Sequence, residues 1–153
     1  MKHYIIDGNN LIGKIKELST VQKKDKQSSR VKLAMMIDNY FDGKKANVTL
    51  HYDGFENEPV KVNSGKIVYS GSGTADDNIK NQISESKNSK NLVVITSDSN
   101  LAQFARVCSS SVIPSEKFAV TIKGKRSDDE TKIINDLKKN SSEFEKLFGI
   151  DDE

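Results

Sequence analysis

The sequence predicts an α/β fold: a three-layer α/β/α sandwich around a mostly parallel, five-stranded sheet. Short apolar runs typical of buried strands alternate with longer segments of helical periodicity. The run at 91–96 contains Leu-Val-Val-Ile-Thr with no polar alternation, which indicates a strand buried on both faces. The segments between the runs can supply the helical crossovers that parallel strands require.

The elements are expected in the following order. Strands are predicted at 3–7, 48–52, 66–69, 91–96 and 111–114, the last at a sheet edge that tolerates Pro114. Helices are predicted at 10–18, 29–42 and 75–87, after Ser97 or Asp98, and briefly at 115–118. Thr74 is the expected N-cap of the third helix. The lysine-rich stretch 20–29 is expected to be a loop.

Composition fits a single domain of ordinary size. The 153 residues are 35% hydrophobic, and no stretch reaches the ~20 apolar residues of a membrane span. We expect no signal peptide, and a single cysteine excludes an internal disulfide, so cytoplasmic residence is the expectation. His3 and His51 are the only histidines, which argues against a zinc site and a Ser/His/Asp triad.

Charge is distributed unevenly along the chain. Residues 128–153 hold nine acids and four lysines, a net charge of −5, so the whole-chain charge of +2 leaves +7 on residues 1–127. Most of the bases in 14–32 have no acidic neighbour in sequence. A basic body suits a polyanionic substrate, although lysine-rich helix faces that are merely solvated would look the same.

Acidic residues follow the apolar runs. Three runs end at Asp7, Asp53 and Asp98, and a fourth leads through a Gly/Ser turn to Asp76 and Asp77. The carboxyl ends of parallel strands lie along one edge, where open α/β sheets bind ligands. Carboxylates gathered there would repel each other unless a divalent cation held them together. Oxygen ligands select hard cations, so Mg²⁺ or Mn²⁺ is the expected metal.

Each of these residues also has a purely structural interpretation. Aspartates at such positions are common N-caps and turn residues, and capping alone would explain Asp98. Asp77 is the weaker candidate, because adjacent helical residues point about 100° apart and Asp76 is better placed. Asn10 could orient water or phosphate at the same edge, or it could cap a helix.

The motifs Tyr4-Ile-Ile-Asp-Gly-Asn-Asn-Leu-Ile12, Gly73-Thr-Ala-Asp76 and Val94-Ile-Thr-Ser-Asp98 together resemble the NYN family of PIN-like nucleases, with the YacP-type branch as the nearest. The resemblance runs from residue 1 to about 120. It implies a PIN-like fold with sheet order 3-2-1-4-5 and divalent-metal-dependent cleavage of RNA. Residues 1–125 would form this domain, and 126–153 a helical, acidic extension of it.

The resemblance also assigns roles. Asp7, Asp76 and Asp98 fall on the family's metal-binding acids, and Asn10 on the asparagine of its opening motif. These four residues are the expected catalytic set. Asn10 and Ser97, which matches a small hydroxyl position beside the last acid, are expected to position phosphate.

One position departs from the pattern of the wider PIN group. Members often carry another acid two residues after the last one, and here Asn100 stands there. A four-acid set would therefore need Asp53 or Asp77 as a metal ligand, and Asn100 is left as a candidate substrate contact.

The sequence thus predicts a ribonuclease, endonucleolytic in mode, that uses Mg²⁺ or Mn²⁺ and acts on RNA, with ribosome-associated mRNA as one candidate substrate. Lys14, Lys16 and Arg30 are the expected contacts to the RNA backbone. The main alternative is a non-catalytic module that binds RNA or the ribosome. A metal-dependent phosphatase is more distant, because Asn9 stands where an Asp-x-Asp motif needs its second acid.

Overall fold

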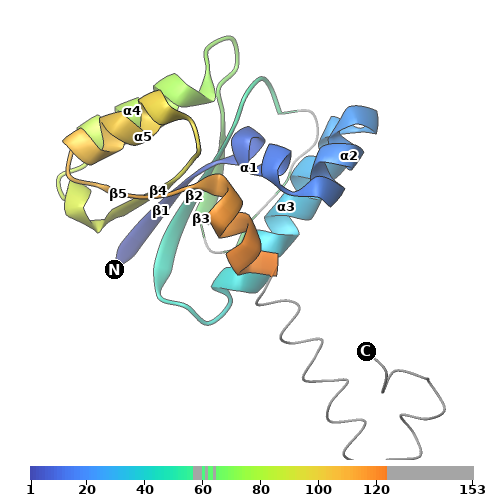
Figure 1. Ribbon diagram of the computed structural model, residues 1–153, viewed down its shortest axis with the longest axis horizontal. Coiled ribbons are helices and arrows are strands. Elements are labelled where there is room, and N and C mark those ends of the chain that lie inside the picture. The colour runs from blue at the N-terminus through green and yellow to red at the C-terminus, as the bar shows by residue number, and fades with distance from the viewer. Residues whose placement is uncertain (57–59, 61, 64, 124–153) are drawn as a thin grey trace, which may run out of the picture.

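The computed structural model describes residues 1–56, 60, 62–63 and 65–123. Its centre is a sheet in the order β3-β2-β1-β4-β5, and all four pairings are parallel (Figure 1). The strands are β1 (Lys2–Asp7), β2 (Ala46–Tyr52), β3 (Gly65–Tyr69), β4 (Leu92–Ile95) and β5 (Ser111–Ile113). The predicted α/β/α sandwich and its 3-2-1-4-5 order are confirmed.

Helices cover both faces of this sheet (Figure 1). They are α1 (Gly8–Lys14), α2 (Lys16–Lys24), α3 (Lys26–Phe41), α4 (Ala75–Glu85) and α5 (Ser99–Val107), and residues 115–123 are also helical. The helices α4 and α5 pack on one face, and the others pack on the opposite face. Within the described residues, no helix has both the length and the apolar character needed to cross a membrane.

Strand alternation sets the two halves of the core. Ile5 and Ile6 are both fully buried, and because neighbouring strand residues point to opposite faces they join different clusters. All four residues of β4 are buried, as its unbroken apolar run predicts. Gly8 lets α1 start directly against β2, since a Cβ there would lie 2.6 Å from the carbonyl oxygen of His51.

The prediction of a loop at 20–29 is wrong. The helix α2 extends to Lys24, and Asp25 then caps α3 by accepting hydrogen bonds from the amides of Gln27 and Ser28 at 3.1 and 3.3 Å. Lysine and glutamine are good helix formers, and a solvated helix face can be lysine-rich throughout. The single helix expected at 10–18 is divided at Ile15 into α1 and α2.

Two other expectations concern the C-terminal part. The brief helix expected at 115–118 continues to at least residue 123, with Phe118, Ala119 and Ile122 buried on one face. The predicted domain limit at 125 and the acidic extension 126–153 lie outside the described residues.

Arg30 is buried inside the domain, with 2% of its surface exposed. Its guanidinium donates to the carbonyl oxygens of Asp53 at 2.6 Å and Phe55 at 3.0 Å. It also stacks near the rings of Tyr52 and Tyr69, at 5.1 and 5.2 Å from their centroids. Arg30 therefore anchors the loop after β2, and the prediction that it contacts RNA is wrong.

We predict that Arg30→Met lowers the free energy of unfolding by about 3 kcal/mol, because two carbonyl groups lose charged donors and two rings lose a cation. Urea denaturation measures the change. Lys32→Met, an exposed change two residues further along α3, should shift stability by less than about 0.5 kcal/mol. Equal effects of the two substitutions would contradict the anchoring role of Arg30.

Candidate active site

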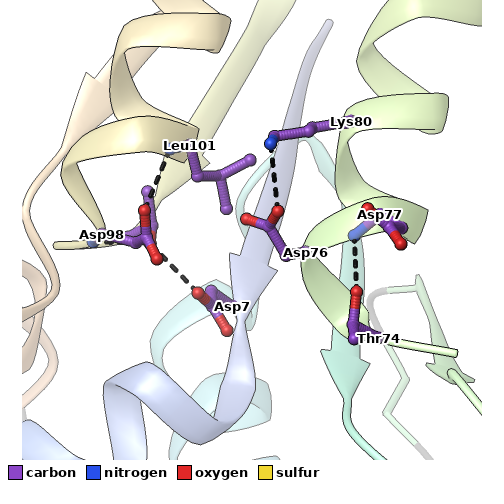
Figure 2. A network of polar contacts seen from close by, with 8 residues as sticks. Asp7, Thr74, Asp76, Asp77, Lys80, Asp98 and Leu101 are labelled. Carbon is purple, nitrogen blue, oxygen red and sulfur yellow. Dashed lines mark hydrogen bonds and ion pairs between the residues drawn. The ribbon is translucent and has the colours of Figure 1, made fainter.

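Four aspartates from separate parts of the chain line one cavity of about 380 Å³ at the carboxyl edge of the sheet. Asp7 ends β1, Asp53 follows β2, Asp76 lies in the first turn of α4 and Asp98 caps α5. Figure 2 shows Asp7 between Asp76 and Asp98. The structure thus brings together the three acids of the predicted catalytic set, with Asp53 beside them.

Asp7 is the most perturbed acid of the cavity. Burial raises its pKa to about 6, and the nearby charges of Asp53 and Asp76 act in the same direction. The Thr96 hydroxyl, which donates to Asp7 Oδ2 at 3.0 Å, and the backbone amide of Asn10 partly oppose this rise. The cavity therefore disfavours negative charge at Asp7 and would favour a proton or a cation there.

Two of the acids are fixed by hydrogen bonds to helix starts. Asp98 Oδ1 accepts from the amide of Leu101 at 3.1 Å, so Asp98 is the N-cap that its position suggested (Figure 2). Asp53 Oδ1 accepts from the amide of Ala75 at 2.7 Å, at the start of α4. Each uses one carboxylate oxygen in this way, so capping and a place in the cavity are compatible.

Asp76 and Asp77 point in different directions. Asp76 lines the cavity and forms an ion pair with Lys80 at 3.1 Å, whereas Asp77 is exposed, turned away and absent from the lining (Figure 2). The structure does not bring Asp77 to the other acids, because successive helical residues diverge by about 100°. Asp76 Oδ1 is buried without a hydrogen-bond partner.

This donor set fits a hard divalent cation in its chemistry. All four side chains offer oxygen, the preferred ligand of Mg²⁺ and Mn²⁺, and the unpartnered Asp76 Oδ1 is an orphan that a cation would satisfy. Among the described residues, however, no three such side chains lie close enough to hold a metal ion as they stand. Binding would therefore require side-chain rotations that draw the carboxylates together.

Asn10 is held from behind by a polar network. Its Oδ1 accepts from the amide of Ser97 at 2.9 Å and from the hydroxyl of Ser115 at 2.6 Å. Because the oxygen is engaged, the NH₂ group remains available on a residue that lines the cavity. The hydroxyl of Ser97 in turn donates to Glu116 and accepts from the amide of Ser115, so Ser97 acts in this network and does not line the cavity.

The other candidate substrate contacts lie outside the cavity. Lys14, Lys16 and Asn100 are exposed, and none of them is part of the lining. The hydrogen bond from Ser97 lowers the pKa of Glu116, and the charge of Lys14 acts in the same direction.

Four polar residues that hydrogen-bond to the predicted site residues were not themselves predicted as part of the site: Asn9, Thr96, Ser115 and Glu116. Asn9 Oδ1 accepts from the amide of Asp53 at 3.2 Å, and the Thr96 hydroxyl contacts both Asp7 and the amide of Asp98. Ser115 and Glu116 follow β5 as the acids follow the other strands, so the same strand-end signal could have identified them.

Comparisons with known proteins agree with this fold. A sequence profile of the YacP-like NYN domain matches residues 4–148. The chain is similar to the crystal structure of Rae1 (YacP) from Bacillus subtilis, with a TM-score of 0.71 and 16% identity over 99% of this chain and 90% of that one. A point mutant of the same protein gives a TM-score of 0.68 and 18% identity over 90% and 86%. No curated protein sequence matches.

We predict that Asp7→Asn raises the free energy of unfolding by about 3 kcal/mol at pH 7.5 in EDTA, since it removes a carboxylate whose folded pKa lies near 6, above the 3.8 of the unfolded chain. The folded wild-type protein binds more protons between these values, so its stability falls as pH rises through this window. The gain should disappear below about pH 4. Denaturation curves across pH test this, and Asp77→Asn should show no such gain.

Proposed function

Because this chain belongs to the YacP-like NYN family, whose fold is that of PIN-like nucleases, we propose that it is a divalent-metal-dependent endoribonuclease. The observation that carries the proposal is the convergence of Asp7, Asp53, Asp76 and Asp98 on one cavity. The sequence places them far apart, and three of them follow strand ends of the parallel sheet. A buried acid with a pKa near 6 and an orphan carboxylate oxygen support a cation in this cavity.

Each residue has a task in this proposal. Asp7, Asp76 and Asp98 would hold Mg²⁺ or Mn²⁺. Asp53 would serve as the fourth acid, because Asn100 occupies the position where a further acid would be expected. The chemistry that such an ion supplies is activation of water and neutralisation of phosphate charge. The Asp76–Lys80 pair is partly exposed and weak, worth about 0.5 kcal/mol, so a cation could replace Lys80.

The RNA backbone would be held by groups next to the acids. The NH₂ group of Asn10 can donate to a phosphate oxygen while its oxygen stays bound to Ser97 and Ser115. Lys14, whose charge acts on Glu116, and Lys16 would attract the strand through charge. Such contacts do not depend on base identity and suit RNA, including ribosome-associated mRNA.

A non-catalytic RNA-binding module is the second candidate, and two observations favour it. Asp76 is already paired with a lysine, and the acids do not form a ready metal cluster among the described residues. Binding of RNA that persists in EDTA, without new RNA ends when Mn²⁺ is added, would favour this alternative.

We predict that Asp7→Asn and Asp98→Asn each lower the rate of RNA cleavage at least about 1,000-fold, since each removes several kcal/mol of charge stabilisation. Mapping of new ends in mixed cellular RNA and ribosomes, with and without Mn²⁺, measures this. Asp77→Asn is the matched control and should cleave at close to the wild-type rate. Full activity in the first two variants would refute the mechanism.

We also predict that Lys14→Ala weakens RNA binding and reduces the slope of log K against log salt by about 0.7, the share of one phosphate contact on a single strand. Fluorescence titration in EDTA over a range of salt concentrations gives both values. Lys45→Ala, an exposed lysine between α3 and β2, should leave the slope unchanged. Identical slopes in all three proteins would remove Lys14 from the RNA contacts.

A further inference from the structure

A second groove, separate from the acidic cavity, runs between α4 and the β2–β3 side of the sheet. Its volume is about 280 Å³. The side chains that carry the inference are all polar and come from three elements: His51, Lys66, Asn78, Asn81, Gln82 and Glu85. None of them belongs to the lining of the acidic cavity.

The floor of this groove is formed by a series of side chains linked by hydrogen bonds. His51 Nε2 contacts Gln82 Oε1 at 2.7 Å, Gln82 Nε2 donates to Thr49 Oγ1 at 3.0 Å, and Thr49 Oγ1 contacts His3 Nε2 at 2.7 Å. Because Gln82 Oε1 can only accept, His51 Nε2 carries the proton and Nδ1 is an acceptor. That Nδ1 is buried without a partner, on a side chain that is 2% exposed. The floor is thus fixed and retains one unsatisfied acceptor.

The side chains at the rim of the groove are polar and have no partners among the described residues. Within the part of the chain that the structure describes, the side chains of Lys66, Asn78, Asn81 and Glu85 form no hydrogen bond or ion pair with one another or with other residues. Lys66 and Glu85 carry opposite charges and border the same groove without pairing. Donors and acceptors around a rigid floor suit a small, flat, polar group more than an apolar ligand.

The groove lies on the same side of the sheet as the acids. Thr49 and His51 share the face of β2 that contacts Gln82 of α4, and Asp53, just beyond this strand, accepts a hydrogen bond from the amide of Ala75 at the start of the same helix. On α4, Gln82 is six residues beyond Asp76, which corresponds to about 9 Å along the helix and about 120° around its axis. The groove therefore lies on a different flank of α4 from Asp76, and a strand whose phosphate sits at the acidic cavity would pass the start of α4 to place a nearby base in the groove.

We propose that this groove binds one unpaired nucleobase of the RNA substrate, next to the scissile phosphate, and prefers a base with an exocyclic amino group. The inference rests on the proposed ribonuclease function. An unpaired acceptor at the rim, the Glu85 carboxylate, selects for amino donors, which adenine, cytosine and guanine carry and uracil lacks. Carboxamides such as Asn81 pair with base edges, and unstacked RNA bases present those edges.

The test is the base composition around the cut. A pool of short, unstructured RNAs is cleaved by the wild-type protein and by Asn81→Ala, Glu85→Gln and the control Gln103→Ala, an exposed carboxamide on α5. We expect uridine to be depleted about tenfold at one position beside the cut, the order of one good base contact. Asn81→Ala and Glu85→Gln should reduce this bias to within about twofold while total cleavage persists, and Gln103→Ala should retain it.

Two results would overturn the inference: no base bias in the wild-type protein, or the same bias in all variants. If the wild-type protein cleaves no RNA, the proposed function fails by itself, and binding decides the groove. Labelled oligocytidine and oligouridine are then titrated in EDTA. A preference for oligocytidine that Glu85→Gln removes would support the groove, and equal binding of the two would overturn it.

Discussion

Parallel pairing on both sides of β1 is the constraint on which the site depends. Because β2 and β4 run in the same direction as β1, their carboxyl ends emerge at one edge, and the chain that follows each strand begins there. Asp7, Asp53 and Asp98 reach the same cavity for this reason. The same geometry brings their charges together, so folding places mutual repulsion at the centre of the edge. Burial raises the pKa of Asp7 most, and this repulsion adds to the rise.

Local patterns were sufficient for most of the fold. Buried strands and amphipathic helices are recorded in apolar periodicity, and the acids are recognisable because strand ends are visible in the sequence. Arg30 shows where this fails. In the sequence it belongs to a basic stretch, but its environment is made by Tyr52, Tyr69 and two carbonyl groups more than twenty residues away. No local pattern contains that information.

The sequence prediction missed the helix at 20–24 and the role of the residues after β5 for a different reason. The segment 20–24 is polar apart from Val21, Leu18 is the one buried residue of α2, and the helix ends at Lys24, directly before the Asp25 cap of α3. Ser115 and Glu116 follow the short edge strand β5 and form hydrogen bonds with Ser97 and Asn10. They support the site through other side chains, and sequence reasoning that looks for ligands passes over such residues.

The capping and ligand interpretations of the acids turn out to be complementary. Asp98 and Asp53 each hold a helix start with one oxygen, which fixes the carboxylate before any ion arrives. Asp7 and Asp76 are held less firmly. The raised pKa of Asp7 disfavours its ionised form, and Asp76 has one oxygen without a hydrogen-bond partner and a weak ion pair with Lys80. In the proposed enzyme, two fixed and two adjustable carboxylates would let a cation assemble its own site. The cost of an ionised carboxylate at Asp7, which comes mainly from burial, would then be relieved on binding, which favours the metal-bound state.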